Sequence, residues 1–230
     1  MTFEYYYNDI PGQGLCRNNL IYTSLMSTDK QTFVQWYHND TEYHKGQNEV
    51  VDPSKMSEKW ARELCWLNHM ATHYSNIVPK IKDIDLVNKK IYLEVDGLDF
   101  WNCAKCNQEN YDKVLPDWQE QMLAIIRTHK EAGLYKFSMH PSSYFIVDGK
   151  LKSINYFFCY HKDEGPISIA DHSSHIHSGR QEIMRDQLAG LGLDWDSLQP
   201  LNKLQQLCFE SFRSNYPDDF IDKAKDIYRD

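Results

Sequence analysis

Residues 133–157 read GLYKFSMHPSSYFIVDGKLKSINYF, and this stretch decides the fold that we expect. Asp148 and Gly149 form a dipeptide that favours a two-residue hairpin turn. The flanking residues 144–147 and 151–155 are rich in branched and aromatic side chains, which is typical of strands. A glycine that follows a helical pattern commonly ends the helix, so Gly133 predicts the stop of a preceding helix. The stretch therefore predicts a helix end, a loop and a β-hairpin, in that order.

Two longer helices are predicted upstream of this stretch. Residues 116–132 carry Trp118, Met122, Ile125, Ile126 and His129 near one face. Residues 57–74 have apolar side chains at three- and four-residue steps, and Ser57 is a plausible N-cap. The stripe of this second helix consists of Trp60, Leu64, Leu67, Ala71 and Tyr74.

Strand patterns dominate the rest of the first third. Residues 20–25 and 32–38 predict a hairpin around the polar turn 26–31, and residues 80–85 and 90–95 predict two more strands. Residues 97–111 look irregular, and the pattern is helical from residue 181 to the end, with a helix start at the acidic residues after Pro217. We therefore expect an α+β fold with two lobes. Its expected parts are a β-rich N-lobe with one helix over 1–97, a hinge over 98–114 and a mostly helical C-lobe over 115–230.

The central stretch resembles the catalytic segment of kinase-like phosphotransferases, especially the aminoglycoside and choline kinase branch. That branch typically reads H-G-D-L-H-P-x-N-I-L-V, then a short hairpin, then I-D-F, and the preceding THKEAGL resembles its L-H-x-A-G-I. The matching positions are Met139, His140, Pro141, Ile146, Val147, Asp148, Gly149 and Ile154.

The resemblance implies a phosphotransfer site, but this chain has lost most of its chemistry. The family uses a strand lysine paired with a helix glutamate, a loop aspartate, and an asparagine and a final aspartate that hold metal ions. Only the glutamate is retained, as Glu63. The other positions are occupied by Gln35, Ser138, Ser143 and Asn155, which carry no charge and supply no base at neutral pH. The resemblance therefore implies no catalytic residues.

Nucleotide binding, if any remains, is expected at a small set of positions. Gly12 and Gly14 precede the first clear strand, where backbone amides could cradle phosphate or form an ordinary turn. Phe33 lies two residues before Gln35, so strand alternation places both side chains on one face. A phenylalanine there would fill the space that adenine takes in the family. The full set is Gly12, Gly14, Phe33, Gln35 and Glu94.

Composition narrows the class of partner. The formal net charge of −8 argues against a nucleic-acid or membrane-surface binder. Six cysteines without an apolar leader favour reduced thiols in the cytoplasm, and no apolar run is long enough to span a membrane. The 15 tyrosines and 6 tryptophans favour a protein interface. We therefore expect another protein as partner, and neither nucleic acid nor membrane.

The first functional hypothesis is a catalytically inactive kinase-like protein that binds another protein and needs no cofactor. Its compact, degenerate motifs suggest a viral (phage) origin, which would place it in the host cytoplasm. The second is an atypical phosphotransferase or nucleotidyltransferase that uses ATP and magnesium in a rearranged site. The third is a structural or assembly component built on the fold. The second hypothesis needs carboxylates from Glu63, Asp96, Asp99, Asp148, Asp163 or Asp171.

A metal site is not expected. The weak candidates are three histidines in the sequence DHSSHIH, whose default interpretation is a solvated polar loop; they are His172, His175 and His177.

Overall fold

A computed structural model describes residues 2–6, 22–38, 53–164 and 201–229. The fold is α+β, with one five-stranded sheet and several helices. The candidate loop residues Gly12 and Gly14 lie outside the described residues, as do the histidines at 172, 175 and 177. The roles predicted for these five residues therefore remain predictions.

The sheet consists of β1 (Phe3–Tyr5), β2 (Thr23–Ser27), β3 (Thr32–Trp36), β4 (Ile81–Asp85) and β5 (Lys90–Glu94). The strands are ordered β1-β2-β3-β5-β4, and every neighbouring pair is antiparallel. The predicted hairpin β2–β3 and the two further predicted strands, β4 and β5, are confirmed. The short strand β1 was not predicted.

The first hairpin turns later than predicted. Its strand β2 continues to Ser27, so Met26, which was assigned to the turn, lies in the strand. The hydroxyl of Ser27 accepts hydrogen bonds from the backbone N–H groups of Gln31 and Thr32, at 3.2 and 2.9 Å. These bonds close the turn over residues 28–31 and fix the register in which Ser24 faces Gln35.

Helix α2 (Pro53–His73) begins four residues before its predicted start, so Ser57 lies inside the helix and is not its cap. Proline suits the first turn of a helix because its missing N–H has no partner there. The buried face is also rotated from the predicted stripe: Leu64, Ala71 and Tyr74 are only half-buried. Among residues 57–73 of the helix, the buried side chains are Lys59, Trp60, Glu63, Leu67 and Met70.

Helix α5 (Trp118–Glu131) is confirmed, and its buried face matches the prediction. Gly133 follows the helix with a φ of +72°, the left-handed conformation that commonly ends helices. Near the end of α5, Nε2 of His129 lies 2.9 Å from the hydroxyl of Tyr156, which ties the helix to the segment after the central hairpin.

Residues 97–111 are more regular than predicted. They contain α3 (Phe100–Cys103) and the 3-10 turn η2 (Gln108–Asn110), and α4 (Tyr111–Val114) follows directly. Asp99 caps α3 by accepting a hydrogen bond from the backbone N–H of Asn102 at 3.0 Å. Turns as short as these leave no periodic apolar pattern, which explains why the sequence looks irregular.

The central stretch folds largely as predicted. After the 3-10 turn η3 (Pro141–Ser143), β7 (Tyr144–Val147) and β8 (Lys150–Ser153) form the hairpin around Asp148 and Gly149, which both have positive φ. A second antiparallel pair, β6 (Leu134–Lys136) with β9 (Cys159–His161), was not predicted. It joins the start of the stretch to the residues that directly follow its end.

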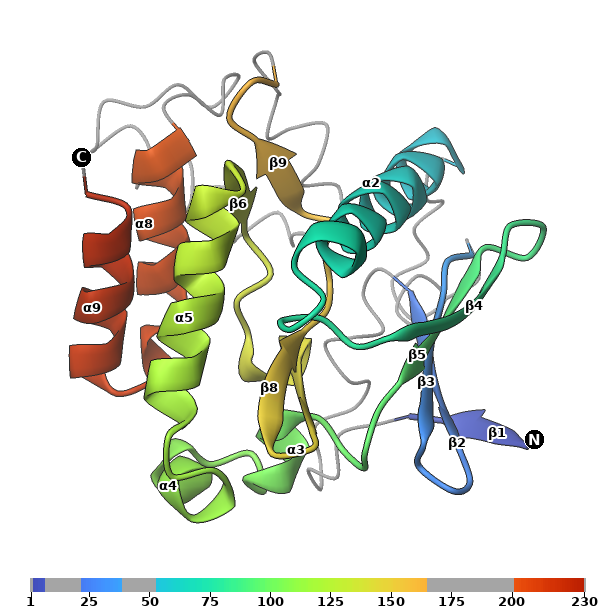
Figure 1. The fold of residues 1–230 in the computed structure, drawn as a ribbon, viewed down its shortest axis with the longest axis horizontal. Helices are drawn as coiled ribbons and strands as arrows, with labels where there is room; N and C mark the ends of the chain where they lie inside the picture. The colour runs from blue at the N-terminus through green and yellow to red at the C-terminus, as the bar shows by residue number, and fades with distance from the viewer. Residues whose placement is uncertain (1, 7–21, 39–52, 165–200, 230) are drawn as a thin grey trace.

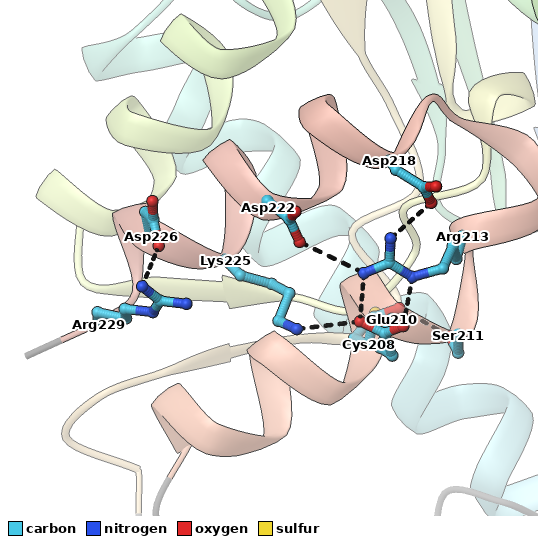
Figure 2. Close-up of polar contacts among 9 residues, drawn as sticks. All are labelled: Cys208, Glu210, Ser211, Arg213, Asp218, Asp222, Lys225, Asp226 and Arg229. Carbon is cyan, nitrogen blue, oxygen red and sulfur yellow. Dashed lines mark hydrogen bonds and ion pairs between the residues drawn. The ribbon is translucent and has the colours of Figure 1, made fainter.

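The C-terminal residues form α8 (Leu201–Ser211), the 3-10 turn η4 (Arg213–Asn215) and α9 (Asp218–Ile227). Figure 2 shows how ion pairs join them: the guanidinium of Arg213 contacts Glu210 on α8 and Asp218 and Asp222 on α9. Lys225 on α9 also reaches Glu210, at 3.0 Å. These pairs fix the turn between the two helices.

Figure 1 shows the overall arrangement. Helices α5, α8 and α9 lie side by side, the five-stranded sheet lies at the opposite side, and α2 and the central hairpin lie between them. The main buried cluster is continuous from Phe33 on the sheet through Leu67 on α2 to Phe220 on α9. Within the described ranges, no helix has the length and apolar character needed to cross a membrane.

Candidate functional site

The site is built on the face of β3 that is directed at the central hairpin. Alternation along the strand places Phe33 and Gln35 on this face, Tyr37 follows directly after the strand, and all three side chains are buried. The ring of Phe33 packs on that of Phe145 in β7, with centroids 4.9 Å apart. Gln35 reaches the residue after the hairpin, Asn155. The face therefore spans the space between sheet and hairpin.

Three of the sequence-predicted positions are joined by hydrogen bonds. The Nε2 atom of Gln35 donates to Oδ1 of Asn155 at 3.0 Å, and Nδ2 of Asn155 donates to Oγ of Ser143 at 2.8 Å. The hydroxyl of Tyr22 donates to the same Oδ1 at 2.6 Å. Because an amide oxygen has two lone pairs, both acceptor sites of Asn155 are used. The resulting chain is neutral and runs from β3 to the start of β7.

Asn155 has a φ of +69°, which few residues other than glycine and asparagine adopt readily. The backbone N–H of Ile154 also donates to the carbonyl of Ser143, at 2.9 Å. The backbone thus turns Asn155 away from the hairpin ladder and toward Gln35. Its orientation is fixed by contacts on both its backbone and its side chain.

Glu63 approaches this chain from α2. Its Oε2 atom accepts a hydrogen bond from the backbone N–H of Phe157 at 2.8 Å, which ties α2 to the residues after Asn155. Burial raises the pKa of this carboxyl to about 7. The hydroxyl of Tyr37 and the ammonium of Lys136 act in the opposite direction, because both favour the charged form.

Lys136 is a buried lysine that the sequence analysis missed. Its Nζ donates to the backbone carbonyl of Ser138 and lies 5.5 Å and 5.6 Å from the ring centroids of Tyr144 and Tyr156. Burial lowers the pKa of Lys136 to about 8. Its burial could not be predicted, because the three-residue strand β6 that carries it forms by pairing with the distant β9 and leaves no local pattern. Ser138 itself is half-buried.

Helix α2 is held along the segment that follows Asn155. Arg62 donates to the carbonyl of Cys159 at 3.1 Å, pairs with Glu164 at 2.9 Å and lies over the ring of Tyr160. One turn further on, Trp66 stacks on the ring of His161 with centroids 5.7 Å apart. These contacts place Glu63 opposite Phe157.

Aromatic rings fill the space next to the hydrogen-bonded chain. Phe33 is 0% exposed, and besides Phe145 it meets Tyr6 and Tyr22 edge-on, with centroids 5.6 and 6.4 Å apart. Phe33 was predicted from the sequence to lie at the site, whereas Tyr22 and Tyr6 were not. Only the fold shows that their rings border Gln35.

The other predicted positions lie apart from this cluster. Glu94, on β5, is partly exposed and its carboxylate pairs with Lys80 at 3.7 Å. Among the candidate carboxylates, Asp148 lies in the exposed hairpin turn, and Asp163 is exposed and faces His161. Asp96 accepts from the side chain of Gln31 at 3.5 Å.

Asp99 is the second buried carboxyl, and its partners are structural. Besides capping α3, it accepts hydrogen bonds from the hydroxyl of Tyr6 and from the side-chain amide of Asn102. Burial raises the pKa of Asp99 to about 6. Asp171, the remaining candidate carboxylate, lies outside the described residues. In the part of the chain that the structure describes, no three His, Cys, Asp or Glu side chains are grouped to hold a metal ion.

Comparison with protein-family models and with curated proteins gives no match to this chain.

Proposed function

We propose that this chain is a kinase-like protein without phosphotransfer activity, which acts by binding another protein. The proposal has two parts. The first is a two-lobed kinase-like arrangement, with a sheet-and-helix lobe over 1–97, a hinge over 98–114 and a helical lobe over 115–230. The second is that the site between the lobes is chemically inert.

The observation that carries the proposal is the chain Gln35–Asn155–Ser143. These residues are far apart in the sequence, and the resemblance assigns all three to one phosphotransfer site. Their hydrogen bonds of 3.0 and 2.8 Å support that assignment, because an unrelated fold has no reason to join them. The contact of Glu63 with Phe157, two residues after Asn155, supports it further.

The same contacts support the absence of catalysis. Magnesium prefers carboxylate ligands. At the positions of the family's metal ligands, this protein has only the amide oxygen of Asn155 and the hydroxyl of Ser143. Tyr22 and Gln35 already use both lone pairs of the amide oxygen of Asn155. Phe33 packs against Phe145 where adenine would bind in the family. Losing one group from an electrostatic site commonly costs a hundredfold or more in rate, and here several are replaced.

The rearranged-enzyme hypothesis receives no comparable support. It needs carboxylates near the hydrogen-bonded residues Gln35, Asn155 and Ser143. Among the described candidates outside α2, Asp96, Asp99 and Asp163 contact other residues, and Asp148 lies in an exposed turn. Binding is the activity that remains for an inert site. Nine of the 15 tyrosines are buried in the core of the described residues, so the tyrosine content reflects packing, and the proposal of a protein partner rests on the inert site.

Restoring the lost groups tests the proposal. The restored variant carries Phe33→Ala, Gln35→Lys, Ser138→Asp, Ser143→Asn and Asn155→Asp, and its melting temperature is measured with and without ATP and magnesium. We expect no shift for the unmodified chain and a rise of several degrees for the restored one. Phe33→Ala alone is the matched control, because it opens space without restoring charge.

Two outcomes contradict the proposal. The first is an ATP-dependent rise in the unmodified chain, with Phe33 in place, because the site would then bind nucleotide as it is. The second is a restored variant with native far-UV circular dichroism that shows no shift at any ATP concentration up to the millimolar range. That result would mean that the five positions do not form a kinase-like site.

A further inference from the structure

Helix α2 carries two histidines one turn apart at its C-terminal end. His69 is half-buried, and His73, the last residue of the helix, is exposed. Residues four apart in a helix lie on the same face. The ring centroids of these two residues are 4.7 Å apart, with an angle of 48° between the ring planes. The two imidazoles therefore form a close pair that solvent can reach.

The ring nitrogens of this pair have no polar partner. Neither ring forms a hydrogen bond or an ion pair with residues 2–6, 22–38, 53–164 or 201–229. The other histidines that the structure describes all use a ring nitrogen in a hydrogen bond; they are His38, His129, His140 and His161. A neutral imidazole nitrogen is the commonest metal ligand in proteins. The pair therefore offers two such ligands at one place.

The distance between the two rings fits a chelate. A zinc–nitrogen bond is about 2.0 to 2.1 Å long, so a bound ion lies roughly 3.2 Å from the centre of each ligating ring. Two imidazoles that bind one ion at an angle of about 90 to 110° then have centres roughly 4.5 to 5.2 Å apart. The observed 4.7 Å lies in this range. Because His73 is exposed, its ring can turn a nitrogen toward the ion.

The surroundings of the pair favour a bound cation. Burial, and then the nearby His73 and His161, lower the pKa of His69, so its ring is in the neutral form that binds metal ions. The C-terminal end of a helix carries a partial negative charge, and His73 lies there. His161 is not a third ligand, because its Nδ1 accepts a hydrogen bond from the backbone N–H of Asp163 at 3.2 Å.

We propose that His69 and His73 form a surface site for a transition-metal dication, namely zinc, nickel or copper. Imidazole suits these ions, whereas magnesium and calcium prefer oxygen ligands. The protein supplies two ligands, and water completes the coordination. The inference goes beyond the proposed function and does not depend on it, because it rests on one face of α2 and not on kinase-like geometry.

Isothermal titration calorimetry of the full chain with zinc or nickel chloride tests the proposal. We expect saturable binding of both ions and none of magnesium at the same concentrations. His73→Ala removes an exposed ligand from the end of the helix and should weaken binding at this site at least about tenfold, because the second ligand of a chelate acts at high effective concentration. The absence of saturable binding up to about 1 mM overturns the proposal.

Two control variants separate the pair from other metal ligands of the chain. Cys65→Ser removes an exposed thiol one turn before His69. His175→Ala removes a histidine from the sequence DHSSHIH. Both should bind zinc and nickel at the α2 site as the unmodified chain does. Loss of that binding in Cys65→Ser, or an unchanged affinity in His73→Ala, overturns the proposal.

A second measurement locates the ion directly. Octahedral nickel is paramagnetic and broadens the signals of nearby nuclei, so proton–nitrogen correlation spectra are recorded while nickel is added in less than equimolar amounts. We expect the backbone amide signals of residues 66–74 to broaden, and to remain sharp in His73→Ala. Broadening that leaves residues 66–74 unaffected overturns the proposal, whatever the calorimetry shows.

Discussion

Among the carboxyl groups of the described residues, that of Glu63 lies in an unusual environment, because it is fully buried. Its pKa rises from the usual 4.5 to about 7, first because it is buried. The folded protein therefore binds more protons at Glu63 than the unfolded chain does between these two pH values. The stability contributed by this group is fully present below about pH 4.5 and is lost as the pH rises through about 7.

Replacing Glu63 with glutamine should remove this loss. We expect Glu63→Gln to gain stability over the unmodified chain as the pH rises from 5 to 8, by up to about 3 kcal/mol. Glutamine can still accept the hydrogen bond from Phe157. Urea unfolding of both proteins across this pH range measures the gain. Parallel pH profiles for the two proteins would show that Glu63 titrates normally.

Phe33 tests the packing of the aromatic cluster. Its ring is fully buried against Phe145, Tyr6 and Tyr22, so Phe33→Ala leaves a cavity and should cost about 3 to 5 kcal/mol of stability. Phe33→Leu retains most of the volume and should cost less than about 1.5 kcal/mol. Chemical denaturation distinguishes these values. A small cost for alanine would mean that the ring is replaceable and that the space beside Gln35 is not tightly filled.

At the residue scale, the position of a residue within the family motif predicted the candidate site better than its amino-acid type did. Gln35, Ser143 and Asn155 were assigned to one site because they occupy positions of a known pattern, and the structure joins them by hydrogen bonds. Lys136 and Tyr37 were missed. Lysine is rarely buried, and tyrosine is common in cores, so neither residue type signals a site on its own. Only the pairing of distant segments brings them near Glu63.

At the scale of elements, the sequence predicted those turns and helices that depend only on residues close to one another along the chain. The turn between β7 and β8 follows from Asp148 and Gly149, and α5 follows from its apolar periodicity. The start of α2 was wrong because Ser57 imitates a cap. The strands β1, β6 and β9 have three residues each, and pairing over long sequence distances creates them. Such pairings leave no local pattern to detect.

Gly133 joins α5 to β6 and offers a test of this junction. A β-carbon built there would lie 2.9 Å from Nε2 of His161, and the residue has a φ of +72°. Gly133→Ala should therefore cost more than the roughly 1 to 2 kcal/mol of the left-handed conformation alone. Gly149→Ala is the matched control, since its φ is +71° and nothing lies within 4 Å. Equal unfolding free energies for both variants would mean that His161 moves aside freely.

At the scale of the whole molecule, the continuous core favours a single cooperative unit. Buried side chains connect the sheet, α2, the central hairpin and the C-terminal helices in one cluster. Helix α2 is held to the segment after Asn155 by Arg62, Glu63 and Trp66. An enzyme that must admit nucleotide and release product needs a site that opens. In the proposed function, the space between β3 and the central hairpin takes the place of the nucleotide site, and aromatic rings and neutral hydrogen bonds fill it.

The most direct test of the central claim is phosphate release from ATP by the unmodified chain, with magnesium or manganese present. We expect a rate no higher than that of a heat-denatured blank, because Gln35, Ser138, Ser143 and Asn155, which the resemblance assigns to the catalytic positions, are all uncharged. The contradicting result is turnover well above the blank that co-purifies with the protein and is abolished by Asn155→Ala. That outcome would mean that Gln35, Asn155 and Ser143 form a working site.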